Sequence, residues 1–166
     1  IEYLMDDNTL VRMLDMRIMR IYKSRIYKKR RAKEEVFRGL MIKIENSITM
    51  RNNILIEAKE RYQKSLETFE SVFDVYCTDI NNATVVINES VKQELFGLYQ
   101  EYGIMFEISI KNNNLYVRFY TGNMFEIDGK SLKGIKKKLC RDYYMFKDIL
   151  TMINRINSIL NRENII

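Results

Sequence analysis

The segment from Ile104 to Tyr120 constrains the fold more than any other part of the chain. Apolar residues occupy every second position of 104–110, and the alternation returns over 115–120 after three consecutive asparagines. A period of two is typical of a strand that buries one face, and asparagine tolerates the left-handed backbone of a tight turn. The segment therefore predicts an antiparallel hairpin with one apolar face.

A second hairpin is predicted near the start of the chain. Residues 11–26 and 36–45 alternate less strictly, and the basic stretch Lys28–Glu35 lies between them as a charged turn. The same region also fits a basic amphipathic helix over 9–33, so both readings remain open. Short apolar runs at 53–57 and 85–87 predict two further strands.

Helical patterns follow in the second half of the chain. Asn88 or Ser90 is a suitable N-cap for a helix that runs to Tyr102, with Gly103 beyond its end. Ser131 similarly precedes a long C-terminal helix. The order of strands, helix, hairpin and helix predicts one α+β domain over residues 1–166, with a mostly antiparallel sheet, one central helix and a long C-terminal helix.

Composition argues against catalysis. The chain has no His, so it has no imidazole base and no His-ligated metal, and its acidic pairs do not have the spacing of a calcium loop. Its two cysteines, Cys77 and Cys140, are too few for a disulfide framework or a four-ligand zinc site. We expect two reduced thiols, with a single bridge as the alternative. The sequence therefore predicts no enzymatic activity, no metal site and no cofactor.

The net charge of +6 is concentrated in clusters. Seven basic residues fall within eleven positions: Lys23, Arg25, Lys28, Lys29, Arg30, Arg31 and Lys33. Such a cluster attracts phosphate groups, either of an anionic membrane surface or of nucleic acid. We interpret it as a candidate anionic-surface contact, with nucleic acid as the less favoured partner. The plainest alternative is a solvated turn that meets nothing.

A second basic patch opens the predicted C-terminal helix and consists of Lys133, Lys136, Lys137 and Lys138. Cations at a helix N-terminus oppose the helix dipole, so their presence there indicates a use. One use is to bind a phosphate. The favoured one is to pair with the acidic middle of the chain, residues 45–107, which carry a net charge of −6.

The sequence has no signal peptide and no apolar run long enough to span a bilayer. Its first residue is Ile rather than Met. We therefore expect it to be a piece of a longer protein.

Short motifs in a fixed order carry a family resemblance. Phe37-Arg38-Gly39-Leu40 is followed by Phe69-x-x-x-Phe73-x-Val75-Tyr76 and Asp79, and Phe125-Glu126 follows the second hairpin. Over residues 5–160 the chain resembles a bacterial membrane-associated family of unknown function. It departs from that pattern at Asn82-Ala83-Thr84, where the family is more basic and aromatic.

The resemblance implies a soluble domain normally preceded by transmembrane helices, on the cytoplasmic side of a bacterial membrane. Without it, the expected location is the cytoplasm. The family defines no functional residues, and the aromatic motif residues Phe69, Phe73 and Tyr76 would pack at a helix-to-strand junction. The function expected is that of a non-catalytic domain acting through an unknown protein partner or an anionic membrane surface. A small basic nucleic-acid-binding protein is the alternative, and the oligomeric state stays open.

Overall fold

One antiparallel sheet organises the chain. The computed structural model describes residues 2–4, 10–23, 31–45, 53–59, 68–122, 124 and 131–162. Within these residues seven strands pair in the order β1-β2-β3-β7-β6-β4-β5. The strands are β1 (Glu2–Leu4), β2 (Leu10–Lys23), β3 (Arg31–Ile44), β4 (Ile54–Ala58), β5 (Phe73–Cys77), β6 (Phe106–Lys111) and β7 (Asn114–Phe119). The helices are α1 (Phe69–Val72), α2 (Ile80–Val86), α3 (Glu89–Tyr102) and α4 (Leu132–Arg162).

The α+β class, the antiparallel sheet and the long C-terminal helix are thereby confirmed. The hairpin predicted from Ile104–Tyr120 is β6–β7, and its turn places Asn112 and Asn113 at φ of 51° and 62°. The predicted ends of the central helix are those of α3. The Asn88 side chain accepts a hydrogen bond from the backbone N–H of Val91 at 3.0 Å, and Gly103 adopts a left-handed φ of 63°.

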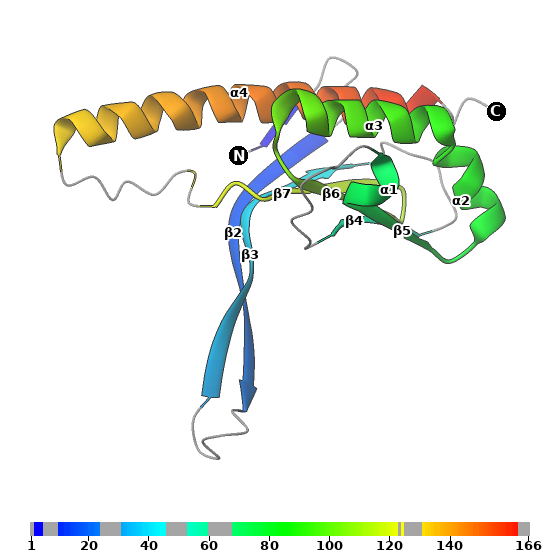
Figure 1. The fold of residues 1–166 in the computed structure, drawn as a ribbon, viewed down its shortest axis with the longest axis horizontal. Coiled ribbons are helices and arrows are strands. Elements are labelled where there is room, and N and C mark those ends of the chain that lie inside the picture. Colours follow the sequence, from blue (N-terminus) through cyan, green and yellow to red (C-terminus); the bar gives the residue numbers. More distant parts are fainter. Residues whose placement is uncertain are drawn as a thin grey trace.

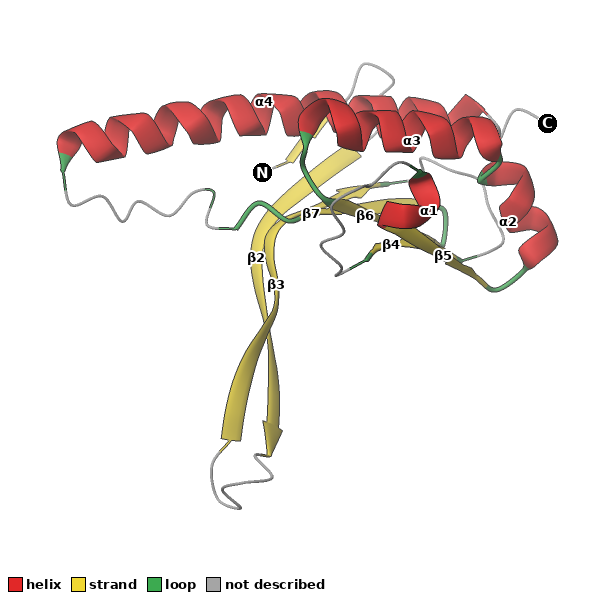
Figure 2. Ribbon diagram, viewed as in Figure 1, coloured by secondary structure: helices red, strands yellow, loops and turns green. Residues whose placement is uncertain are grey.

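Helices α3 and α4 lie across one face of the sheet, and the core fills the space between the layers (Figure 2). The sheet contributes alternate residues such as Ile42, Phe106 and Val117, and the helices contribute Leu95 and Ile153, all buried. A side-chain oxygen of Ser131 accepts a hydrogen bond from the N–H of Gly134 at 3.2 Å, as an N-cap does.

Only part of α4 packs on the sheet. Its C-terminal half lies beside α3, where Arg155 pairs with Glu101, whereas its N-terminal half extends past the sheet (Figure 1). The helix is 31 residues long but carries too many charges to be a membrane span. In the described part of the chain, no helix combines the length and apolar character needed to cross a bilayer.

The hairpin β2–β3 is much longer than the rest of the sheet. Its strands pair from Val11 opposite Ile44 to Lys23 opposite Arg31, but β7 pairs only with Leu40–Ile44. The remainder is a two-stranded ribbon that leaves the sheet on the side away from α4 (Figure 1). We call this ribbon, residues 16–23 and 31–39, the arm.

Two sequence interpretations are corrected in this region. The alternative of a helix over 9–33 is wrong, because Leu10–Lys23 is a strand. Residues 31–35 were assigned to the charged turn, but they continue β3. Residues 33–36 are exposed on both faces of the strand, so charged residues such as Lys33 and Glu34 fit it without apolar alternation.

The strand predicted at residues 85–87 is also wrong. Val85 and Val86 belong to α2, and Ile87 follows in a turn. Ala83, Val86 and Ile87 are buried, at the three- and four-residue spacing of one helix face. A run of three apolar residues does not by itself distinguish a strand from a buried helical segment.

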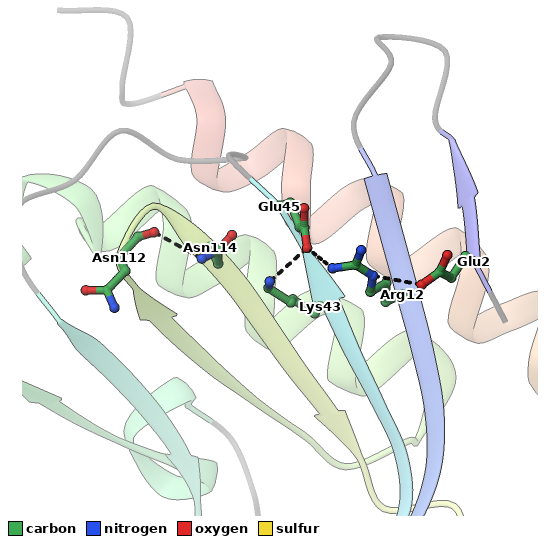
Figure 3. A network of polar contacts seen from close by, with 6 residues as sticks. All are labelled: Glu2, Arg12, Lys43, Glu45, Asn112 and Asn114. Carbon is green, nitrogen blue, oxygen red and sulfur yellow. Dashed lines mark hydrogen bonds and ion pairs between the residues drawn. The ribbon is translucent and has the colours of Figure 1, made fainter.

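A polar network fixes the end of the strands farthest from the arm (Figure 3). Arg12 of β2 pairs with Glu2 of β1 at 2.8 Å and with Glu45 just after β3. Lys43 contacts the same Glu45 carboxylate at 2.8 Å. This hydrogen bond lowers the pKa of Glu45, against a smaller opposing effect of desolvation. The network therefore ties three neighbouring strands together at this end of the sheet.

Candidate functional site

The first predicted basic cluster belongs to the far end of the arm. Lys23 and Arg31 are the last paired residues of the ribbon, and the Lys33 side chain is exposed. Arg25, Lys28, Lys29 and Arg30 lie outside the described residues. In the sequence they stand between Lys23 and Arg31, the pair that ends the described part of the arm.

Acidic residues of the arm lie nearer the sheet and face cations there. Glu35 pairs with Arg17 at 2.6 Å and lies 4.0 Å from Arg38, and Glu34 is opposite Arg20 in the strand register. Beyond these positions the described arm adds only basic charge. The positive charge of the distal end is therefore not offset by the arm's own carboxylates.

An aromatic and ionic cluster holds the base of the arm. Phe37 is only 2% exposed and meets Tyr120 edge-on, with ring centroids 5.2 Å apart. The Arg118 guanidinium lies 5.8 Å from the Phe37 ring and pairs with buried Glu107. The Tyr120 hydroxyl donates a hydrogen bond to Glu107 Oε1 at 2.6 Å. The pKa of Tyr120 is raised, chiefly because the hydroxyl is partly buried and secondly because of this hydrogen bond. We call these four residues the root cluster.

The sequence contained a signal for part of the root cluster. A turn at Asn112 and Asn113 sets the register of β6–β7 and places Glu107 opposite Arg118. The local pattern does not mark this pair as a site, because the contact between Arg118 and Phe37 comes from a distant strand. The cluster joins the arm to the two central strands of the sheet.

Gly39 marks the place where the arm leaves the sheet. A Cβ atom at this position would lie 2.0 Å from the backbone oxygen of Phe119 and 2.9 Å from the backbone nitrogen of Thr121. Only glycine permits so close an approach of two backbones. The family motif Phe37-Arg38-Gly39-Leu40 thus coincides with the junction of arm and sheet.

The second basic patch lies on the part of α4 that extends past the sheet. Lys133, Lys136 and Lys137 are exposed, and none of the three forms an ion pair with another described residue. Lys138 is different, because it pairs with buried Asp142 and donates to the backbone oxygen of Met124 at 3.0 Å. The favoured pairing with the acidic middle of the chain is therefore not formed by these exposed lysines within the described structure.

The two basic clusters do not merge into one patch. The arm points away from the sheet on the side opposite α4, so its tip and the helix are separate projections (Figure 1). Each must be tested by its own substitutions.

A shallow hollow of about 350 Å³ lies where α1, β5, α2 and the start of α3 meet. Phe69 and Phe73 are buried beside it, which confirms their predicted packing role. Tyr76 is 52% exposed instead, because strand alternation turns it to the face of β5 away from the helices.

Charged side chains around the hollow neutralise one another. Lys59 pairs with Asp74 at 3.0 Å, and Lys92 with Glu70 at 2.8 Å. The hydrogen bond between the latter two lowers the pKa of Glu70 and raises the pKa of Lys92. Each of the four charged side chains in the described lining is therefore paired with an opposite charge.

Within the described residues, the two thiols lie apart, and neither belongs to a group of possible metal ligands. Cys77 is half-buried beside the hollow, Cys140 is exposed on α4, and both are free. Over the ranges that the structure describes, no three Cys, Asp or Glu side chains converge as metal ligands would.

Fold and site together define a single-sheet α+β domain with two cationic projections. Residues 17–161 match a family described as "Protein of unknown function (DUF3137)", and the chain belongs to this family. The resemblance to an uncharacterised family is thereby confirmed. No curated protein and no solved structure matches the chain.

Proposed function

We propose that this is a non-catalytic domain of a membrane-tethered bacterial protein, and that it contacts an anionic membrane surface through the distal end of the arm. In this proposal the domain faces the cytoplasmic leaflet. The observation that carries the proposal is a projecting ribbon whose far end bears a dense basic cluster and whose described part pairs with no third strand.

Length and charge both suit this role. Eight residues of β2 lie in the arm, which gives a reach of about 26 Å at about 3.3 Å per residue. A basic residue close to an anionic leaflet contributes about 1 kcal/mol, so several of them together give a salt-sensitive attachment. Exposed Ile21 near the distal end adds an apolar contact at the same place.

Nucleic acid is the second candidate, and the shape of the arm favours it specifically. The major groove of duplex DNA admits a two-stranded ribbon, and basic side chains at its tip would meet phosphates. An acidic protein surface would present similar charge to the arm. Lipid vesicles and a duplex oligonucleotide separate the membrane from nucleic acid as the partner of the arm.

Replacing Lys28, Lys29, Arg30 and Arg31 together with serine is expected to weaken binding to phosphatidylglycerol-containing vesicles by about tenfold or more, since about 1.4 kcal/mol suffices for tenfold. A matched control replaces Lys59, Lys92, Lys111 and Arg155 with serine. Each variant removes four positive charges from +6 and leaves +2. Vesicle co-sedimentation at low salt compares both variants with the wild type.

Specific contact through the arm requires that the control variant bind nearly as well as the wild type. Equal losses in both variants would reduce the effect to net charge and contradict the assignment to the arm. Binding of a duplex oligonucleotide without any binding of vesicles would replace the membrane proposal with the nucleic-acid alternative.

A further inference from the structure

The part of α4 that extends past the sheet carries an exposed apolar stripe. We call residues 131–144 the overhang, since Met145 and Phe146 already pack against the core. Leu132, Leu139 and Tyr143 are 87%, 51% and 65% exposed, although spacings of seven and four residues place them on one side of the helix. Single exposed apolar side chains are common, whereas several aligned on one side of a helix indicate a contact surface.

The stripe continues the side of α4 that packs inside the domain. Leu132 and Leu139 begin a series of apolar residues repeated every seven positions, which goes on through Phe146, Ile153 and Leu160. The last two are fully buried. In a straight α-helix, residues seven positions apart are rotated by about 20° around the helix axis. Four such steps separate Leu160 from Leu132. Leu160 faces the sheet, and Leu132 is therefore rotated from it by about a quarter turn. The series is therefore buried where α4 packs on the sheet and exposed where the helix extends past it.

Lysines border the stripe. Lys136 lies one turn after Leu132, and Lys147 lies one turn after Tyr143, and both are exposed. The acidic residue of the overhang is Asp142, which is buried against Lys138. The exposed charge along this part of α4 is therefore entirely positive.

This charge distribution selects among possible occupants. A second copy of the overhang would bring the same lysines together, which opposes self-association through this surface. An anionic partner is required. An amphipathic helix with leucine and tyrosine on one side and lysines along the border suits the lipid interface, where apolar side chains enter the acyl boundary and lysines extend to the phosphates.

We infer that the overhang lies flat in the interface of an anionic bilayer, with Leu132, Leu139 and Tyr143 inserted. This inference rests on the proposed contact with a membrane and adds a second, apolar attachment to the electrostatic one of the arm.

The absence of Trp from the chain allows a direct test. Leu139→Trp places one fluorophore in the stripe, and Cys140→Trp places one on the neighbouring exposed position, about 100° around the helix. With phosphatidylglycerol vesicles, the emission of Leu139→Trp should shift to shorter wavelength and be quenched by brominated lipid. Cys140→Trp should change little, and co-sedimentation is measured on both proteins.

The outcomes separate this inference from the proposed function. Co-sedimentation without a shift at Leu139→Trp, or with equal shifts in both variants, would overturn insertion of the stripe and leave contact by the arm intact. Failure of both variants and the wild type to co-sediment would contradict the proposed function itself. A shift at Leu139→Trp with an acidic helical peptide but not with vesicles would assign the stripe to a protein partner and overturn the lipid assignment.

Discussion

Gly39→Ala is expected to lower the free energy of unfolding by about 3 kcal/mol or more, because overpacking costs about 1–3 kcal/mol and occasionally more, and here the added atom meets backbone. The new Cβ would lie 2.0 Å from the backbone oxygen of Phe119, so neither strand can yield by rotating a side chain. The φ of 158° is also one that residues with a side chain rarely adopt. Urea denaturation followed by circular dichroism measures the loss.

Gly97→Ala provides the matched control. Gly97 lies inside α3, and a Cβ there would have no heavy atom within 4 Å. Alanine is the better helix former, so this variant should gain about 0.5–1 kcal/mol. Similar stabilities for the two variants would show that the close approach at the base of the arm does not exist in solution.

Phe37→Ala is expected to cost about 3 kcal/mol, the lower end of the range for truncation of a buried phenylalanine. The substitution removes the ring that packs against Tyr120 and Arg118, and it leaves the buried Glu107 carboxylate more open to water. An isolated two-stranded ribbon is marginally stable in water, so loss of this anchor should also loosen the arm. Unfolding in urea gives the stability, and amide hydrogen exchange of β2 and β3 gives the local opening.

Val36→Ala is the matched control for Phe37→Ala, because it truncates the neighbouring side chain of the arm without removing a contact of the root cluster. Val36 is exposed. It is the extra residue of a β-bulge in β3, because Ile18 pairs with Phe37 and Met19 pairs with Glu35. Val36→Ala should change stability by no more than about 0.5 kcal/mol. If Phe37→Ala were as mild as Val36→Ala, the root cluster would not hold the arm.

The predictable parts of the fold are those whose signal is local. Alternation in β6 and β7 and the asparagines between them define a hairpin without reference to the rest of the chain. Asn88 and Gly103 likewise define the two ends of α3 through their own backbone and side-chain chemistry. These elements then predict an α+β domain.

The unpredicted parts depend on distant contacts or on solvent. Residues 33–35 of β3 are exposed on both faces of the strand, so they lack the apolar alternation by which a strand is recognised. Val86 and Ile87 are buried by the helix layer, which a run of three apolar letters does not reveal. Glu107 is buried, and its partners Arg118 and Tyr120 both meet Phe37 of the arm, a contact that follows only from the assembled sheet.

The clustering of basic residues can be predicted from the sequence, but the environment of each side chain cannot. Sequence clustering identified Lys133, Lys136, Lys137 and Lys138 together. The structure separates Lys138, which is used inside the domain, from the three exposed lysines. The reason is Asp142, one turn further along α4, whose burial requires a cation beside it.

The most direct test of the proposed membrane contact is the partition of the wild-type domain between buffer and lipid vesicles. We expect binding to phosphatidylglycerol-containing vesicles, no binding to pure phosphatidylcholine vesicles, and a steep loss of binding as salt rises and screens the basic clusters. Equal binding to both kinds of vesicle, or no binding to either at low salt, would contradict the account.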